Sequence, residues 1–300
     1  MIRLFAPAKI NLSLEVLGKR ADGYHEVRTV LQAIDLADEV LIEPSEINIS
    51  LRIEPAGALS VEGNLVLRAA DALREETGVS AGAGIVLRKR IPVAAGLGGG
   101  SSDAAATLLG LRKLWEVDRD KAAAYRVATS LGADVPFFLR GGTALGSGRG
   151  DALELLGLPI ERFAVVVTPP EAQDPSKTAR LYGMLRPEHF SDGSRTAEVA
   201  RRIASGRPLG DAMSNTFDAV AGQAYRRYHE ACSIVRAAST RRAAREKRVL
   251  LAGAGPSVFT LVDDRDEGDA IAAEAHEQGY EAHVARLLGP WSSDGLRELP

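Results

Sequence analysis

The sequence predicts an α+β protein built of two domains. Segments with the two-residue alternation of β-strands and segments with the wider spacing of amphipathic helices occur in both halves of the chain. The length of the chain indicates two domains, because 300 residues are about twice the roughly 150 of an ordinary domain. Its 45% share of hydrophobic residues is typical of a globular protein. Each predicted element follows from such local patterns.

The chain is predicted to open with a β-hairpin. Between residues 9 and 16, apolar residues occupy the even positions and polar residues the odd ones, which indicates a strand with one packed face and one polar face. Asp22 and Gly23 are typical hairpin-turn residues. A second β-rich run, residues 27–42, follows the turn.

Helical and strand patterns then alternate. Residues 64–77 place apolar side chains at helical spacing, with Asn64 able to cap the start and Gly78 to end the helix. A strand is predicted over 84–87, and further helices are predicted over 103–115 and 121–131.

The pattern restarts at the apolar run 163–167, shortly after Pro159. We therefore predict a domain boundary near residues 155–162, with domains of residues 1–158 and 159–300. In the second half, helices are predicted over 178–185, 195–205, 218–238 and 267–278, and strands over 249–252, 258–262 and 281–286.

Composition and charge narrow the possible functions. With 37 Lys and Arg against 40 Asp and Glu, the net charge of −3 argues against binding nucleic acid through bulk charge. No apolar stretch reaches the roughly 18 residues that cross a bilayer, and no secretory signal is recognisable. Cys232 is the only cysteine, which favours a reducing compartment. We expect a cytoplasmic protein that acts on small molecules, with no nucleic-acid or membrane partner.

The glycine-rich segment 92–110, PVAAGLGGGSSDAAATLLG, carries the strongest functional signal. Glycines between 96 and 100 let the backbone bend with N–H groups pointing inward, and a helix opening at residues 101–103 would attract phosphate to its N-terminus. A flexible loop capped by Ser101 or Ser102 is the alternative. No lysine follows the glycines as a P-loop requires, and Ser101 replaces the third glycine of the dinucleotide fingerprint.

Three ordered motifs resemble the GHMP kinase superfamily. AGLGGGSSDAAA (95–106) is similar to its second signature, PAKINL (7–12) to its first and LAGAGPSVF (251–259) to its third. The resemblance implies an N-terminal domain like the second domain of ribosomal protein S5, a ferredoxin-like C-terminal domain, and ATP bound between them with Mg²⁺ and no protein-held metal. The ATP contacts it implies are Asn64, Pro92, Val93, Ala94, Ala95, Gly96, Leu97, Gly98, Gly99, Gly100, Ser101 and Ser102.

Two further segments, ADGYHEV (21–27) and LGADVPFFLRGGTALGSGRGD (131–151), resemble one branch of this superfamily. That branch phosphorylates the 2-hydroxyl of 4-(cytidine 5′-diphospho)-2-C-methyl-D-erythritol in non-mevalonate isoprenoid synthesis. The resemblance implies that Asp134 accepts the hydroxyl proton and that Lys9 keeps this carboxylate ionised and polarises the hydroxyl. The local sequence also permits a helix cap at Asp134 and an exposed strand lysine at Lys9.

The same resemblance implies the substrate contacts. Tyr24 would stack on the cytosine and His25 would bond its edge, although a packed hairpin end is the alternative for this pair. In the third motif, alanines replace the usual hydroxyl residues, so backbone N–H groups, with Ser257 supplying a hydroxyl, are expected to contact the substrate or phosphate. The implied substrate contacts are Asn11, Tyr24, His25, Tyr182, Gly253 and Gly255.

Two other functions stay open on the sequence. One is another small-alcohol kinase of the same superfamily, like homoserine or mevalonate kinase. The other is a catalytically silent sensor that binds a nucleotide or metabolite on the same scaffold. The chain is expected to be a monomer or a homodimer.

Overall fold

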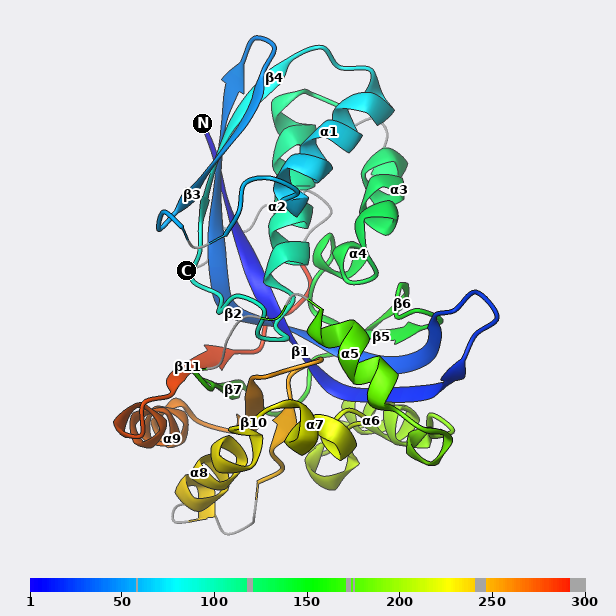
Figure 1. Ribbon diagram of the computed structural model, residues 1–300, viewed down its shortest axis with the longest axis vertical. Helices are drawn as coiled ribbons and strands as arrows, with labels where there is room; N and C mark the ends of the chain where they lie inside the picture. The colour runs from blue at the N-terminus through cyan, green and yellow to red at the C-terminus, as the bar shows by residue number, and fades with distance from the viewer. Residues whose placement is uncertain (58, 118–120, 171–173, 175, 241–246, 292–300) are drawn as a thin grey trace.

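The computed structural model describes residues 1–57, 59–117, 121–170, 174, 176–240 and 247–291. Two sheets organise the molecule, which has an upper and a lower part in the view of Figure 1, and the larger sheet extends from the upper part into the lower one. The larger sheet has seven strands: β1 (Ile2–Lys19), β2 (His25–Ser45), β3 (Ile49–Glu54), β4 (Gly82–Arg88), β5 (Thr143–Ser147), β6 (Ala152–Leu156) and β8 (Ser214–Asn215). The smaller sheet has four: β7 (Phe163–Thr168), β9 (Leu250–Leu251), β10 (Val258–Val262) and β11 (Glu281–Arg286).

Nine α-helices are assigned within the described residues, and most of them cover the sheets. They are α1 (Leu65–Thr77), α2 (Gly99–Leu114), α3 (Lys121–Leu131), α4 (Val135–Phe138), α5 (Lys177–Met184), α6 (Ser194–Ala204), α7 (Asp218–Ala224), α8 (Tyr228–Thr240) and α9 (Arg265–Glu277). Single 3₁₀ turns occur at Pro187–His189 and Gly210–Ala212.

The predicted N-terminal hairpin is confirmed, but its strands are longer than predicted. β1 and β2 pair antiparallel from Ile2 opposite Ile42 to Lys19 opposite His25, and together they run through both parts of the molecule (Figure 1). Gly23 at the turn has φ 85°, the left-handed conformation that favours glycine.

The strict alternation predicted for residues 9–16 is wrong. The pairing register shifts between Asn11 and Ser13, so the side chains change faces at that bulge. Leu12 lies in one apolar cluster with residues of both halves, whereas Leu14 lies in a second cluster and also lines the cleft described below. The polar residues between positions 9 and 15 are buried as well, with Lys9 only 5% exposed.

Several helices match their predictions closely. α1 begins after Asn64, whose side chain accepts a hydrogen bond from the Val66 amide, and it ends at Gly78 with φ 69°. The predicted helix at 103–115 starts four residues earlier, because Gly99 and Gly100 form its first turn after Gly98, with φ 73°. The single helix predicted over 218–238 is wrong, since an extended Tyr225 separates α7 from α8.

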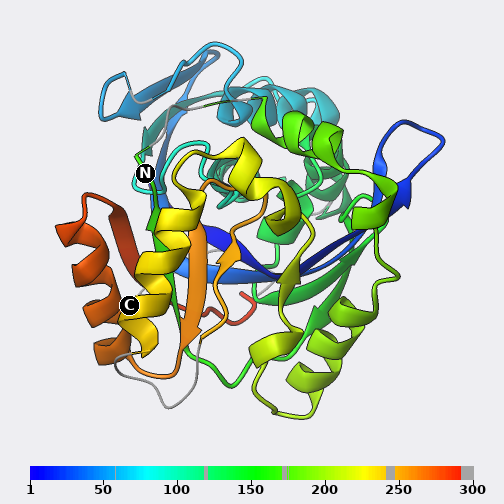
Figure 2. The ribbon, with the colours of Figure 1, turned by 60° about the horizontal axis from the view of Figure 1, so that its bottom comes forward.

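The smaller sheet has the expected ferredoxin-like arrangement. In chain order its strands are β7, β9, β10 and β11, and in space they lie in the order β11-β7-β10-β9 with antiparallel neighbours. This is the β-α-β-β-α-β pattern, with α8 and α9 packed beside the strands (Figure 2).

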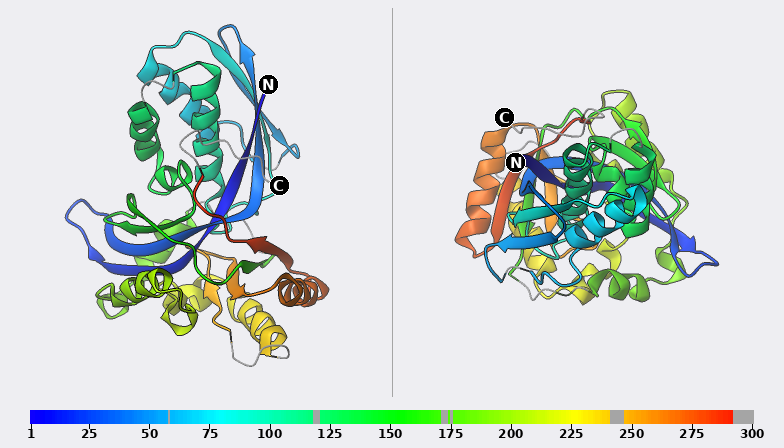
Figure 3. Two further views of the ribbon diagram at one scale, coloured as in Figure 1. Left: turned by 180° about the vertical axis from the view of Figure 1, so that it is seen from behind. Right: turned by 90° about the horizontal axis from the view of Figure 1, so that it is seen from above.

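The two parts share structure at several points. β8 from the second half pairs with β1, and the segment after β11 returns to the first half, where the Leu288 amide donates to the Ala33 carbonyl and the Trp291 amide to the Arg140 carbonyl (Figure 3). The chain passes from β6 to β7 near residue 158, but the division into domains at that residue stays a prediction.

Across the described ranges, every helix is too short or too polar to cross a membrane.

Candidate active site

A cleft of about 1580 Å³ brings together the three sequence motifs. It is lined by residues of β1 and β2, the glycine-rich segment, the start of α4, the helix α5 and the turn between β9 and β10. The predicted site residues that line it are Lys9, Asn11, Tyr24, His25, Pro92, Val93, Ala94, Ala95, Gly96, Leu97, Gly98, Gly99, Gly100, Ser101, Asp134, Tyr182 and Gly253.

Lys9 and Asp134 meet in this cleft. The Lys9 Nζ lies 3.7 Å from the Asp134 Oδ2 and donates to the Asn11 Oδ1 at 2.8 Å. The Asn11 Nδ2 in turn donates to the Thr29 Oγ1 at 2.8 Å, which orients the amide oxygen toward the lysine. Lys9 is therefore a buried residue held in a defined position, and the alternative of an exposed strand lysine is wrong.

Asp134 occupies the cap position of α4 without capping it. No hydrogen bond from its side chain to the first turn of the helix is present. The side chain is 38% exposed and faces the cleft, where the lysine is its ion-pair partner. The helix-cap alternative for this aspartate is thus wrong, and the carboxylate is accessible to a small molecule.

We call residues 96–101 of the glycine-rich segment, which line the cleft, the glycine cradle. The Lys9 amide donates to the Leu97 carbonyl at 2.9 Å, so this segment is tied to β1. A Cβ added at Gly98 would lie 2.9 Å from the Phe138 ring, and one at Gly96 only 1.9 Å from the Ala252 carbonyl oxygen. No side chain caps α2, so the first N–H groups of this helix are available to a phosphate. The alternative of a loop capped by Ser101 or Ser102 is wrong.

A buried charge cluster lies beneath the cradle. Lys89 donates to Asp38 and, at 2.8 Å, to Asp103, and its Nζ would lie 3.3 Å from a Cβ added at Gly99. Burial raises the pKa of Asp103 to about 8, against the opposing charge of Lys89. Sequence analysis did not single out this cluster, because its members are far apart in the chain.

Aromatic rings form the far end of the cleft. The His25 and Tyr182 rings stack with centroids 4.5 Å apart and planes 19° apart. Burial, and then the charge of Lys19, lower the pKa of His25, so its ring is neutral at neutral pH. Tyr24 is 58% exposed, and the Arg149 guanidinium lies 5.3 Å from its ring centroid. The structure therefore places His25, and not Tyr24, against Tyr182.

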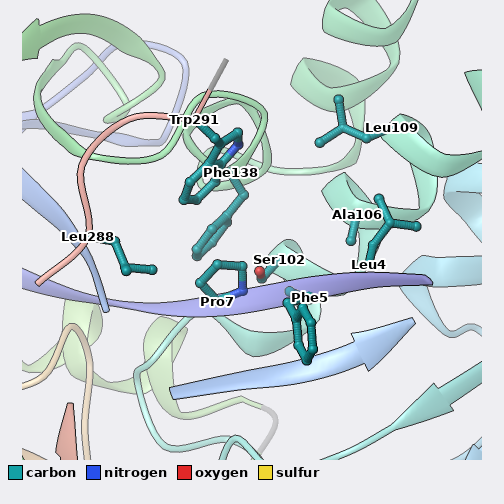
Figure 4. A pocket seen from close by; sticks show the side chains of 10 residues that line it. Leu4, Phe5, Pro7, Ser102, Ala106, Leu109, Phe138, Leu288 and Trp291 are labelled. Atoms are coloured by element: carbon teal, nitrogen blue, oxygen red, sulfur yellow. The ribbon is translucent and has the colours of Figure 1, made fainter. Parts of the chain in front are cut away.

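Four predicted contacts lie outside the cleft lining. The Asn64 amide caps α1, and the Gly255 carbonyl accepts a hydrogen bond from Lys177. Ser257 is fully buried and its hydroxyl pairs with Thr168. The Ser102 side chain lines a separate small cavity beside Phe138 and Trp291 (Figure 4), because helix α2 begins early and turns this side chain away from the glycine cradle.

Lys177 is a site residue that sequence analysis missed. It is the first residue of α5, it lines the cleft, and its ammonium donates to the carbonyls of Ala94 and Gly255. A lone lysine at the start of a predicted helix has no distinguishing local signal.

Metal ligands are not clustered in this cleft. Within the ranges the structure describes, no group of three or more His, Cys, Asp or Glu side chains is arranged to hold a metal ion. The donors present, N–H groups and lysines around the glycine cradle, suit a polyphosphate.

Comparison with known proteins identifies relatives of this chain. The family model for the GHMP kinases N terminal domain matches residues 64–142. The 4-diphosphocytidyl-2-C-methyl-D-erythritol kinase of Dehalococcoides mccartyi is 36% identical over 291 residues, covering 97% of this chain and 99% of that protein. The enzyme of the same name from Pelotomaculum thermopropionicum is 39% identical, with the same coverage of both chains.

Solved structures agree as well. A crystal structure of 4-(cytidine 5′-diphospho)-2C-methyl-D-erythritol kinase superposes with a TM-score of 0.79 at 34% identity, covering 96% of this chain and 100% of that one. Homoserine kinase from Cytophaga hutchinsonii, at 20% identity and a TM-score of 0.73 over 97% of this chain and 96% of that one, shares the fold. The identity over nearly full length and the shared two-domain fold place this chain in the 4-diphosphocytidyl-2-C-methyl-D-erythritol kinase family of the GHMP kinases.

Proposed function

We propose that this protein transfers the terminal phosphoryl group of ATP to the 2-hydroxyl of 4-(cytidine 5′-diphospho)-2-C-methyl-D-erythritol. The observation that carries this proposal is the Lys9–Asp134 pair, 3.7 Å apart, in a cleft that also contains the glycine cradle. The names of the full-length relatives supply the identity of the alcohol.

The pair suits the proton transfer that the reaction requires. Phosphoryl transfer passes through a loose, in-line transition state, so the protein mainly positions the reactants and neutralises charge. In the proposed reaction the Asp134 carboxylate accepts the proton of the 2-hydroxyl while the hydroxyl oxygen bonds to phosphorus and the bond to ADP breaks. Lys9, held by Asn11, orients that carboxylate and offers positive charge to the entering phosphoryl group.

The glycine cradle suits the phosphates of ATP. Its positive-φ glycines bring backbone N–H groups close to the cleft, where side chains would obstruct a ligand. Mg²⁺, which kinases of this superfamily generally use with ATP, supplies further charge neutralisation when bound to the phosphates.

The stacked rings suit the cytosine of the substrate. A neutral His25 can both donate to and accept from the edge of a base, and Tyr182 offers a flat surface next to it. Burial raises the pKa of Tyr182 to about 12, so its ring stays uncharged. We propose that the base enters against this pair, with Tyr24 and Arg149 at the exposed rim.

A substrate comparison tests the proposal. Purified protein with ATP and Mg²⁺ is assayed for ADP release with the CDP-linked methylerythritol, with homoserine and with mevalonate. Turnover of the CDP-linked alcohol alone, inhibited by added CDP, is the expected result. Turnover of homoserine or mevalonate without the CDP-linked alcohol would overturn the proposal, and nucleotide binding without any turnover would identify a sensor.

A further inference from the structure

Lys177 is a buried cation that the proposed chemistry has not yet used. Only 8% of the residue is exposed, although it lies in the first turn of α5. Its ammonium lies between the Ala94 carbonyl of the glycine-rich segment and the Gly255 carbonyl of the turn between β9 and β10. One side chain from the second half thus joins two motif loops at the cleft.

Carbonyl dipoles are the partners that the structure gives this ammonium. Among the described residues, no carboxylate forms an ion pair with Lys177; the nearest acidic residue in sequence, Asp174, pairs with Arg180 at 3.2 Å. A buried charge bonded only to neutral acceptors is a costly arrangement, which a bound anion would relieve.

A second positive charge faces the same region. Burial, and then the charge of Lys9, lower the pKa of Lys177 to about 7, with Asp174 acting in the opposite direction. The two lysines come from β1 and α5, so no single sequence motif contains both. Asp174 itself lines the cleft, and the other charged side chains that line it are Lys19, Lys89, Asp134 and Arg149.

We infer that Lys177 is a further phosphate-binding residue of this active site, which together with Lys9 contacts the terminal phosphoryl group of the bound nucleotide. This inference rests on the proposed function, since it assumes a nucleoside triphosphate in the glycine cradle. The two lysines repel each other, and the negative charge of a terminal phosphate between them would offset this repulsion. During the transfer, negative charge develops on the oxygen that leaves with ADP and remains on the other oxygens of the transferred phosphoryl group, where a preorganised ammonium stabilises the transition state.

Contact with the terminal phosphate distinguishes this role from a structural one. If Lys177 only joined the two loops, its loss would weaken the binding of all nucleotides alike. If it contacts the terminal phosphate, its loss weakens the binding of a triphosphate analogue much more than that of a diphosphate. Such a contact also makes nucleotide binding take up protons at about pH 8, because the phosphate raises the pKa of a lysine that is largely neutral there.

Calorimetry of the full chain tests the inference without relying on turnover. Binding of Mg²⁺ with AMPPNP, a non-hydrolysable ATP analogue, and with ADP is measured at about pH 8 in two buffers of different ionisation enthalpy. The variants are Lys177→Met, Lys177→Arg and, as a matched control, Lys113→Met on the exposed surface of α2.

In Lys177→Met we expect AMPPNP to bind roughly 10- to 100-fold more weakly, because a charge-assisted contact is lost. ADP affinity should change by less than about threefold. Proton uptake with AMPPNP should disappear. Lys177→Arg should recover part of the AMPPNP affinity, and Lys113→Met should bind as the parent protein does.

The inference would be overturned if Lys177→Met bound ADP and AMPPNP more weakly by the same factor. It would also be overturned if this variant bound AMPPNP as the parent protein does, with the same proton uptake. If AMPPNP binds with proton uptake that depends on Lys177 but no alcohol is phosphorylated, the inference stands and the proposed function fails. If the parent protein does not bind AMPPNP, both fail.

Discussion

Asp134 is the residue on which the proposed proton transfer depends. Asp134→Asn keeps the shape of the side chain but removes the base, so kcat should fall by about 10²- to 10⁴-fold. The KM for ATP should change little, because the amide still fits beside Lys9 at the start of α4. Steady-state kinetics measure both parameters, with Asp71→Asn on the exposed face of α1 as the control. Undiminished turnover by Asp134→Asn would remove this carboxylate from the mechanism.

Lys89 has a different task, which is to place a positive charge between two buried acidic side chains. Lys89→Met would leave Asp38 and Asp103 facing each other with side chains no more than 2% exposed. We expect the free energy of unfolding to fall by about 3–5 kcal/mol near neutral pH.

The pH dependence of this loss has a definite sign. Loss of the Lys89 ammonium raises the folded-state pKa of the two acids above their values in the parent protein, because that ammonium opposes the rise. An acid with a raised folded-state pKa destabilises the folded state once the pH exceeds its unfolded-state pKa. The deficit of Lys89→Met should therefore be smallest near pH 4 and grow between about pH 4 and pH 8. Urea unfolding across this range measures it, with Lys113→Met as the exposed control. A deficit that does not vary with pH would contradict the explanation.

At the level of elements, the contact between the second and third motifs depends on Gly96. Its φ of 86° and the 1.9 Å approach of an added Cβ to the Ala252 carbonyl leave no room for a side chain. Gly96→Ala should lower the free energy of unfolding by about 3 kcal/mol or more.

Gly100 provides the comparison, because it lies in the first turn of α2 with its nearest neighbour 3.6 Å from an added Cβ. Gly100→Ala should leave stability unchanged or raise it by up to about 1 kcal/mol. Thermal unfolding measures the stability of both variants. Equal stabilities would mean that the glycine-rich segment does not pack against the turn between β9 and β10 as described.

Element boundaries were predictable where a periodic pattern coincided with a clear end signal. α1 lies between its Asn64 cap and Gly78, and β11 covers the predicted residues 281–286. The start of α2 was not predictable, since glycine is compatible with both a loop and a helix turn. The break between α7 and α8 accompanies a tertiary contact, the bond from the Tyr225 hydroxyl to the Ala254 carbonyl, which no local pattern reveals.

At the level of the whole molecule, the two parts are expected to unfold together. β1 and β2 run through both, and apolar clusters combine side chains from both halves. The segment after β11 adds a further link, because Trp291 packs next to Gly141 and beside Phe138 of α4 (Figure 4).

Trp291→Ala should therefore lower the free energy of unfolding by about 2 kcal/mol and leave a single transition. Denaturant unfolding followed by fluorescence and by circular dichroism measures this. Ile47→Ala, at a side chain in a turn that is 69% exposed, should change stability by less than about 0.5 kcal/mol. Two separate transitions would show that the shared strands do not couple the parts.

The α+β class, most of the elements and the three family motifs could be read from local patterns, because periodicity, caps and glycine runs depend on neighbouring residues. The approach of Lys9 to Asp134 was expected from the family resemblance and not from any local pattern, whereas the burial of Lys9 and the pairing of His25 with Tyr182 became visible only in the folded chain. The same holds for Lys89, Lys177 and the displaced Ser102. Each of these depends on contacts between segments far apart in sequence, and no spacing along the chain encodes which distant groups will share a buried space.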